Sequence, residues 1–324
     1  MVNVRTDLAV EAREIYKDTY KREADGVVVE ESTIDDIKVT SVNVKSEGGA
    51  VKIGKPMGTY ITIDIPEFTH YDGEIMDRVS DVLSHSLKDL IKINHEKTAL
   101  VIGLGNWNVT PDALGPKVVE KMMITRHLKQ VMPEAIDDSV RPVCALAPGV
   151  LGITGIETVE IIKGLVEKVN PSVVVCIDAL ASRRLERVNR TIQIGDTGIS
   201  PGAGVGNKRM QINEEYLGVP VIAIGVPTVV DAATIVNDAM DLVLDEMISQ
   251  SSEGGEFYNM LKSIDKNEKG HMIKSLLNPY VGDLMVTPKE VDIVIDSVSK
   301  IISNGLNMAL QPNLDMEDIN KFMN

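Results

Sequence analysis

Residues 172–178 read Ser172-Val173-Val174-Val175-Cys176-Ile177-Asp178, an unbroken apolar run that ends in an acidic residue. Such a run, rich in β-branched side chains, is typical of a strand buried on both faces of a parallel sheet. Similar runs occupy residues 99–104, 143–146 and 219–226, and a shorter one lies at 191–194. Helical segments alternate with these strands, so the sequence predicts an α/β fold with a mainly parallel sheet covered on both faces.

The segments between and around the strands carry helix signals. Apolar residues recur at helical spacing from Glu74 to Ile93, and another helix is expected from about Pro111. Thr154 and Glu157 stand in capping-box spacing before a third helix. A further helix, from Asp231 to Ile248, follows the last of the strands. These segments supply the helical layers that the sheet requires.

The chain is expected to form one domain with three parts of different character. A low-complexity stretch from Ser249 to Glu256 separates the core from a helical end, whose last strong helix begins at Thr287-Pro288 and ends at Gly305. The expected ranges are residues 8–324 for the domain, 27–66 for a β-rich N-terminal part, 74–250 for the core and 256–310 for the helical C-terminal part.

The composition excludes several partners. The 324 residues carry a formal net charge of −15, which repels phosphate backbones and anionic lipid, so neither nucleic acid nor a membrane is an expected partner. No apolar run approaches the ~20 residues of a membrane span, and the N-terminus lacks the apolar centre of a secretory signal. Cys144 and Cys176 lie in apolar strand-like runs and are expected to be reduced core residues of an intracellular protein.

Two acidic residues are expected at one edge of the sheet, where the carboxyl ends of parallel strands border a crevice. Asp178 directly follows its strand, and Asp112 lies between residues 99–104 and the next helix. Each has a structural interpretation, Asp112 as a first-turn acid after Thr110-Pro111 and Asp178 as a cap for the next turn. A second Val-Thr-Pro at residues 286–288 also precedes a helix, so that tripeptide alone indicates only a helix start. The coincidence of two acids at one edge favours a functional site.

Residues 195–209 form a glycine-rich loop that could approach a substrate or a phosphate closely. It is not a Walker A loop, because Asn207 interrupts the pattern and no Ser or Thr follows the lysine. Gly-Ile-Ser-Pro-Gly at 198–202 matches the letters of a nucleophile elbow, but its proline removes an N–H that the oxyanion hole needs. Asp196 is expected to form a turn rather than to join the acidic pair. The loop therefore indicates neither a nucleotide-hydrolysing site nor a serine hydrolase.

Nine ordered motifs extend over nearly the whole chain. They are residues 4–11 (VRTDLAVE), 103–106 (GLGN), 109–116 (VTPDALGP), 124–128 (ITRHL), 148–150 (PGV), 154–158 (TGIET), 177–180 (IDAL), 204–209 (GVGNKR) and 285–292 (MVTPKEVD). Together they resemble the germination protease family of endospore-forming bacteria. The resemblance implies an endopeptidase that degrades small acid-soluble spore proteins during germination, in the cytoplasm of the forespore or spore core.

The resemblance also implies a fold and a site. The family's two essential aspartates match Asp112 and Asp178. Its fold is similar to that of the hydrogenase-maturation endopeptidases, a three-layer αβα sandwich with a mainly parallel sheet, here with an N-terminal β segment and C-terminal helices added. Those relatives also use a metal-liganding histidine, which has no clear match in this chain.

The family is made as a zymogen that removes its own N-terminus, and its substrates are cut between an acidic residue and a large apolar one. Residues 6–11 resemble such a site, so self-cleavage is expected between Asp7 and Leu8, with residues 1–7 as the propeptide. The structural alternative is that Thr6 and Asp7 cap the first helix. A homo-oligomer such as a tetramer is expected from the family, although residues 250–282 form a shorter stretch than in the better-known members.

The paired acids suggest a hydrolytic mechanism that needs no cofactor. One carboxylate accepts a proton from water while the other, protonated, donates to the carbonyl or the leaving amine. In an alternative, Asp112 and Asp178 hold a divalent metal that polarises the carbonyl. An alternative from another class is a nucleotide- or anion-binding module built on residues 195–206, against which the acidic neighbourhood argues.

Overall fold

The computed structural model describes residues 6–66, 72–132, 134, 136–204, 206, 209–264, 266–281 and 284–323. Its strands are β1 (Val27–Ile34), β2 (Ile37–Val44), β3 (Gly58–Asp64), β4 (Ala99–Gly103), β5 (Val143–Leu146), β6 (Val173–Ser182), β7 (Thr191–Gly195), β8 (Val221–Asp231) and β9 (Met285–Val286). Its helices are α1 (Ala9–Tyr20), α2 (Glu47–Ile53), α3 (Gly73–Leu90), α4 (Leu114–Glu120), α5 (Arg126–Val131), α6 (Leu151–Thr154), α7 (Thr158–Val169), α8 (Glu214–Leu217), α9 (Ala232–Gln250), α10 (Glu256–Lys262), α11 (Lys266–Val281), α12 (Val291–Leu310) and α13 (Met316–Met323), with short 3-10 turns η1 (Thr110–Asp112) and η3 (Leu185–Arg187).

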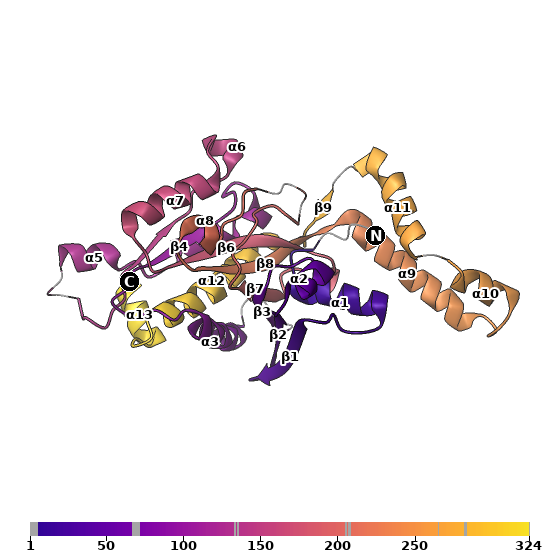
Figure 1. The fold of residues 1–324 in the computed structure, drawn as a ribbon, viewed down its shortest axis with the longest axis horizontal. Helices are drawn as coiled ribbons and strands as arrows, with labels where there is room; N and C mark the ends of the chain where they lie inside the picture. Colours follow the sequence, from indigo (N-terminus) through magenta and orange to yellow (C-terminus); the bar gives the residue numbers. More distant parts are fainter. Residues whose placement is uncertain are drawn as a thin grey trace.

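A single mixed sheet organises these elements, in the order β1-β2-β3-β7-β8-β6-β4-β5, with β9 beside β8 (Figure 1). The half formed by β8, β6, β4 and β5 is parallel, as the apolar runs predicted. The other half is antiparallel, because β7 pairs antiparallel with β8 and links it to the hairpins of β1, β2 and β3. The predicted α/β fold is confirmed, and the N-terminal β segment extends the same sheet.

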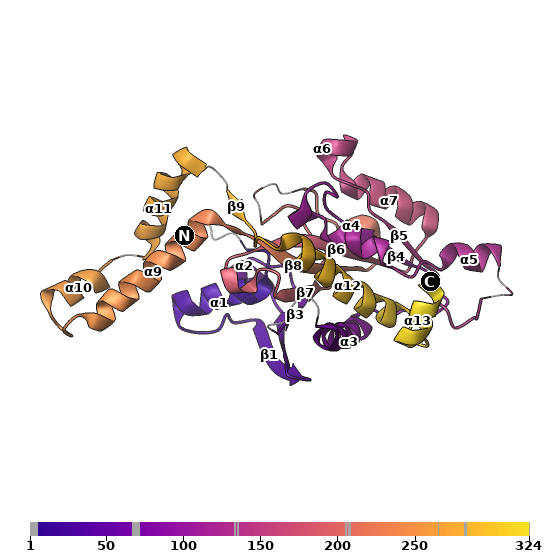
Figure 2. The same cartoon turned by 180° about the vertical axis from the view of Figure 1, so that it is seen from behind.

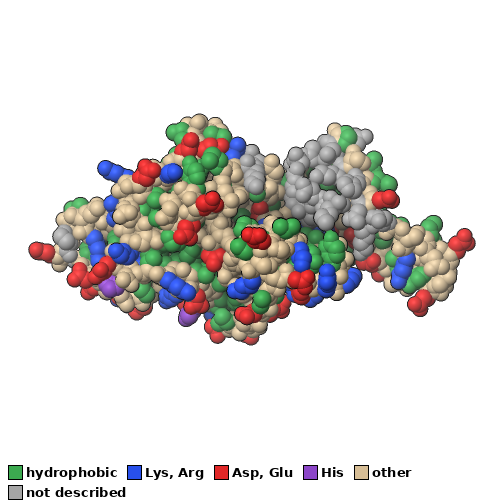
Figure 3. All heavy atoms as spheres, viewed as in Figure 1, with side chains coloured by type: hydrophobic (Ala, Val, Ile, Leu, Met, Phe, Trp, Pro, Cys, Tyr) green, Lys and Arg blue, Asp and Glu red, His purple; other side chains and the backbone are tan. Residues whose placement is uncertain are grey.

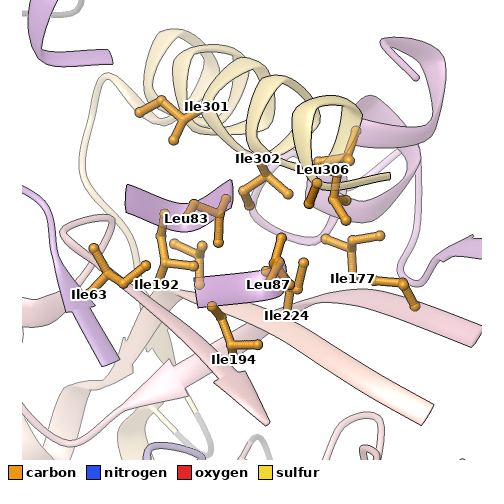
Figure 4. Packing of buried hydrophobic residues seen from close by; sticks show 14 of the residues in the cluster. Ile63, Leu83, Leu87, Ile177, Ile192, Ile194, Ile224, Ile301, Ile302 and Leu306 are labelled. Carbon is orange, nitrogen blue, oxygen red and sulfur yellow. The ribbon is translucent and has the colours of Figure 1, made fainter. Parts of the chain in front are cut away.

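Helices cover both faces of the sheet. On one face α3 and α12 place Leu83, Leu87 and Ile302 against strand residues such as Ile177 and Ile224 (Figure 4). The view from behind shows α12 lying along β4, β6 and β8 on this face (Figure 2). The other face packs against α7 over the parallel strands, and against α1 and α2 over β2 and β3. The layers are therefore helix, sheet and helix.

Strand β6 is longer than the sequence indicated. The predicted strand stopped at Ile177, whereas β6 continues to Ser182 because β8 pairs with it along that whole length. Strand β4 pairs with β6 only as far as Gly103 opposite Ile177. Asp178 thus lies inside a strand rather than after one, at the point where β6 extends past its neighbour β4.

Three local helix predictions were wrong. Thr154 and Glu157 form no capping box, because Thr154 ends α6 and its hydroxyl accepts a hydrogen bond from the N–H of Ile156 at 3.1 Å. The helix expected from Pro111 begins as the 3-10 turn η1, and α4 starts at Leu114. Gly305 does not end the last helix, since α12 continues to Leu310.

An arm of three helices projects from one end of the molecule, and it begins within the range predicted for the core (Figure 1). It comprises α9, α10 and α11, and α9 has no buried residue along its 19 positions. On the face drawn in Figure 3, the described Lys and Arg side chains are interspersed with Asp and Glu. Within the described ranges, no helix is long and apolar enough to cross a membrane. Cys144 and Cys176 are free thiols, as predicted.

Gly305 allows α12 to cross α3 closely, and its replacement tests that packing. A Cβ at Gly305 would lie 2.8 Å from Leu83 Cδ2 and 3.0 Å from the Ser80 carbonyl oxygen. We expect Gly305→Ala to lower the free energy of unfolding by about 1–3 kcal/mol in urea titrations, despite the better helix propensity of alanine. Gly164→Ala in α7, where a Cβ meets nothing within 4 Å, is the control and should be neutral or stabilising. Equal stability of the two variants would contradict this account of the crossing.

Candidate active site

The two predicted acids, Asp112 and Asp178, line one cavity of about 450 Å³ at the parallel edge of the sheet. The N–H of Leu104, the residue after β4, donates to the Ile177 carbonyl at 2.8 Å, which joins the end of β4 to β6 just before Asp178. The chain then turns through residues 105–109 and brings Asp112 back over the same edge. The structure therefore brings together the pair that sequence reasoning had placed at one edge.

Glycines make this return possible. A Cβ at Gly103 would lie 2.2 Å from the carbonyl oxygen of Gly115, so β4 and α4 meet backbone to backbone. At Gly105 the backbone is left-handed (φ +114°), and a Cβ would lie 2.0 Å from the Asp112 carbonyl oxygen. Any larger residue at these positions would push η1 away from the sheet. The glycines flanking the first Val-Thr-Pro thus distinguish it from the second copy.

Asp112 and Asp178 have unequal surroundings. Asp178 is only 5% exposed. Burial raises the pKa of Asp178 well above its ordinary value, and the negative charges of Asp112 and Asp7 raise it further. Burial also raises the pKa of Asp112, but the N–H of Asn106 donates to its carboxylate at 2.8 Å and opposes that rise. Asp178 is therefore the more easily protonated of the two acids.

Several lining residues were not singled out from the sequence. The second Val-Thr-Pro, interpreted as only a helix start, also reaches the cavity: Val286 pairs with Val230, and the Thr287 hydroxyl donates to the Thr228 carbonyl at 2.9 Å. Arg209, from the glycine-rich loop, lines the cavity too. The glycine-rich loop was a signal for a cleft, whereas Thr228 and Thr287 gave none, because only the pairing of β9 with β8 brings them there.

The predicted cleavage site lies beside the acids. The N–H of Asp7 donates to the Ala181 carbonyl at 3.1 Å, and the Ala181 N–H donates to the Asp7 carboxylate at 2.9 Å. Leu8 is fully buried and packs with Val10 and Leu180. Asp7, rather than Asp196, is thus the third acid near Asp178, because Asp196 accepts a hydrogen bond from the Thr59 N–H at 2.7 Å instead.

The cavity offers carboxylates but no further metal-binding side chains that the structure describes. Over the described ranges there is no group of three or more His, Cys, Asp and Glu side chains placed to hold a metal ion. Asp112 and Asp178 are the carboxylates that a divalent cation would meet there.

A parallel sheet edge with one buried and one half-buried carboxylate in a cleft defines an enzyme of the α/β class. A family model described as germination protease matches residues 6–262 and 245–323. Curated proteins named germination protease are 75% identical in Clostridium perfringens and 62% identical in Clostridium tetani, each over the whole of both chains. One from Bacillus velezensis is 41% identical over 97% of this chain and 95% of its own. The chain belongs to the germination protease family, and it is a peptidase.

A solved structure is also similar. It is the [NiFe] hydrogenase maturation protease HycI from Thermococcus kodakarensis, with 17% identity and a TM-score of 0.28, covering 60% of this chain and 99% of that one.

The raised pKa of Asp178 has a consequence for stability. A carboxyl group whose pKa is higher in the folded than in the unfolded state favours folding when protonated, so its ionisation costs stability as the pH rises from the unfolded toward the folded pKa. We expect Asp178→Asn to raise the melting temperature at pH 7 by about 2 °C or more, and this gain to shrink as the pH falls toward 4. Calorimetry across that range checks the prediction, with exposed Asp81→Asn as control. A gain that stays constant with pH would mean that ionisation of Asp178 is not its cause.

Proposed function

We propose that this chain is the endopeptidase that initiates degradation of small acid-soluble spore proteins during germination, acting in the cytoplasm of the forespore or spore core. Its membership of the germination protease family supports the substrate class. The observation that carries the chemistry is the single cavity lined by two acids of unequal burial, Asp112 and Asp178.

The mechanism follows from that inequality. Asp178 is buried beneath the charges of Asp112 and Asp7, which favours its protonated form, while the Asn106 N–H favours the ionised form of Asp112. We assign Asp112 as the base that takes a proton from the attacking water and Asp178 as the acid. Asp178 first donates its proton to the carbonyl oxygen. Asp112, which has taken a proton from the water, then donates it to the leaving amine. No cofactor enters this scheme. In the metal-dependent alternative the same two carboxylates hold a divalent ion.

We also propose that the protein is a zymogen, with residues 1–7 as a propeptide removed by self-cleavage between Asp7 and Leu8. The competing interpretation, that Thr6 and Asp7 cap the first helix, applies to Thr6 alone. The Thr6 hydroxyl accepts a hydrogen bond from the Leu8 N–H at 3.1 Å, whereas Asp7 directs its carboxylate to β6. Leu8 has extended backbone angles (φ −82°, ψ 129°), the conformation in which proteases bind their substrates. The N-terminal segment and the acids share one end of β6.

Self-association is a further part of the proposal. The projecting arm exposes Leu242 on α9 and Met272 and Leu276 on α11, each more than 60% exposed. Apolar side chains exposed on an arm that leaves the body of the molecule favour contact with another copy, in a homo-oligomer such as a tetramer.

Replacement of either acid tests the proposed chemistry. Asp112→Asn and Asp178→Asn should each slow self-cleavage, and cleavage of an added small acid-soluble spore protein, by about 100-fold or more, because each removes one proton transfer. Gel electrophoresis with N-terminal sequencing measures both reactions, and a new N-terminus at Leu8 identifies the bond. Asp81→Asn should react like the unmodified protein.

The outcome that would refute this assignment is an Asp178→Asn protein that still removes its N-terminus at the normal rate. Incubation with EDTA separates the two versions of the mechanism, since activity that survives exhaustive chelation excludes the metal-dependent one.

Sedimentation velocity tests the proposed assembly. The unmodified chain should sediment faster than a 35.3 kDa monomer, and Leu242→Glu with Leu276→Glu on the arm should shift it toward the monomer. The exposed substitutions Asp81→Asn and Lys52→Met should leave the sedimentation coefficient unchanged. A chain that is monomeric at micromolar concentration would contradict the proposal.

A further inference from the structure

The carboxylate of Asp7 lies in a small cradle made mostly of backbone. The N–H of Ala181 donates to it at 2.9 Å, and the N–H of Gly204, in the glycine-rich loop, donates as well. Two backbone donors that converge on one carboxylate form a fixed anion site, because the chain fixes their direction and neither N–H loses its proton. Burial raises the pKa of Asp7, and the two N–H groups together with the positive charge of Lys55 oppose that rise.

Gly204 leaves a space that the Asp7 carboxylate enters. A Cβ at this position would lie 2.0 Å from Asp7 Oδ2 and 2.6 Å from its Cγ. The backbone of Gly204 is not left-handed, so the conformation itself would accept an alanine. It is therefore the occupant of the cradle, together with the neighbouring Ala181 side chain, that requires glycine here.

Lys55 and Gln193 hold the backbone of the same segment. Lys55 Nζ donates to the Asp7 carbonyl at 2.7 Å, and Gln193 Nε2 donates to it at 3.2 Å. The other side-chain atom of Gln193, Oε1, accepts a hydrogen bond from the N–H of Ala9 at 2.6 Å. The bond between Asp7 and Leu8 is thus held on both sides by one glutamine. A pocket for an acidic side chain and a clamp on the following peptide bond occur together.

We propose that Lys55 and the N–H groups of Ala181 and Gly204 form the subsite that selects an acidic residue on the amino side of the cleaved bond. The inference rests on the proposed function and assigns specificity-determining residues to it. Asp7 occupies the subsite in cis, and it leaves with residues 1–7 when the chain is cleaved. The vacated cradle then takes the acidic side chain of a substrate in trans.

The chemistry of the cradle predicts its selectivity. An ionised Asp or Glu accepts charge-assisted hydrogen bonds from both N–H groups and interacts with the ammonium of Lys55. An Asn side chain of the same shape would retain at most the weaker neutral bonds and turn its own NH₂ toward one of the donors. We therefore expect discrimination of about 10-fold or more between Asp and Asn at this position.

Competition between two peptides measures that selectivity. One peptide copies residues 2–14 of this chain, and the other carries Asn in place of Asp7. Both are mixed with full-length protein that has processed itself, and mass spectrometry follows their loss. The ratio of the two kcat/KM values does not depend on how much of the enzyme is active. It should be about 10 or more for the unmodified protein and lower for Lys55→Met, which removes the positive charge but keeps both N–H donors.

Lys52→Met is the matched control, because Lys52 lies in α2, which ends two residues before Lys55, and pairs with Asp25 at the surface. It should preserve the ratio. An Asp-to-Asn ratio near one in the unmodified protein, or a ratio unchanged in Lys55→Met, would overturn the proposal. If neither peptide is cut by any of these proteins, the proposed function fails instead, and the cradle is judged by the following measurement.

Melting temperatures test the cradle without catalysis. In proteins that all carry Asp112→Asn, so that the N-terminus stays intact, Gly204→Ala should lower the melting temperature by about 3 °C or more. In the Asp7→Ala background the same change should cost less, because the clashing carboxylate is gone and only the contact with Ala181 Cβ, at 2.8 Å, remains. Gly164→Ala should behave alike in both backgrounds. Equal costs of Gly204→Ala with and without the Asp7 carboxylate would show that the cradle does not hold it.

Discussion

The close approach of β4 to α4 is the constraint on which the cleft depends. A Cβ at Gly103 would lie 2.2 Å from the Gly115 carbonyl oxygen, and a Cβ at Gly115 would lie 2.3 Å from the Leu104 carbonyl oxygen. This contact holds η1 against the sheet edge, and η1 carries Asp112. Because Asp178 extends from β6 at the same edge, the distance between β4 and α4 decides whether the two carboxylates share one cavity. The apolar core beneath, where α3 and α12 cover the strands, gives that edge a rigid base.

Burial then makes the pair chemically unequal. Both acids lose solvent, but only Asp112 receives a backbone N–H from its own loop, while Asp178 lies deeper and beside two other negative charges. Two identical residue types thus acquire different proton affinities, which is what an acid and a base working on one peptide bond require. The cost is stability at neutral pH, since the folded state must keep a carboxyl group where its charge is disfavoured.

The N-terminal segment, which we propose to be a propeptide, lies beside the two acids. Asp7 adds a third carboxylate to the same end of β6, and Leu8 fills an apolar site formed by Val10 and Leu180. Leu8 is fully buried and Asp7 is hydrogen-bonded to Ala181, yet the bond between these two residues is the one we propose to be cut. In the proposed scheme its side chains occupy the places that a substrate uses, so removal of the segment also opens the site.

The sequence by itself determined the parallel strands and the meeting of Asp112 with Asp178 at one edge, because buried β-branched runs and their following loops are local signals. The extent of β6 was not a local signal, since Val173–Ser182 remains a strand only through its pairing with β8. The position of Thr287 was not a local signal either, because it depends on the pairing of β9 with β8. The same holds for Gly305, which allows α12 to cross α3 closely. Only the tertiary structure brought Asp7 to Ala181 and Gly204, because contacts across more than 170 positions of the chain leave no trace in local periodicity.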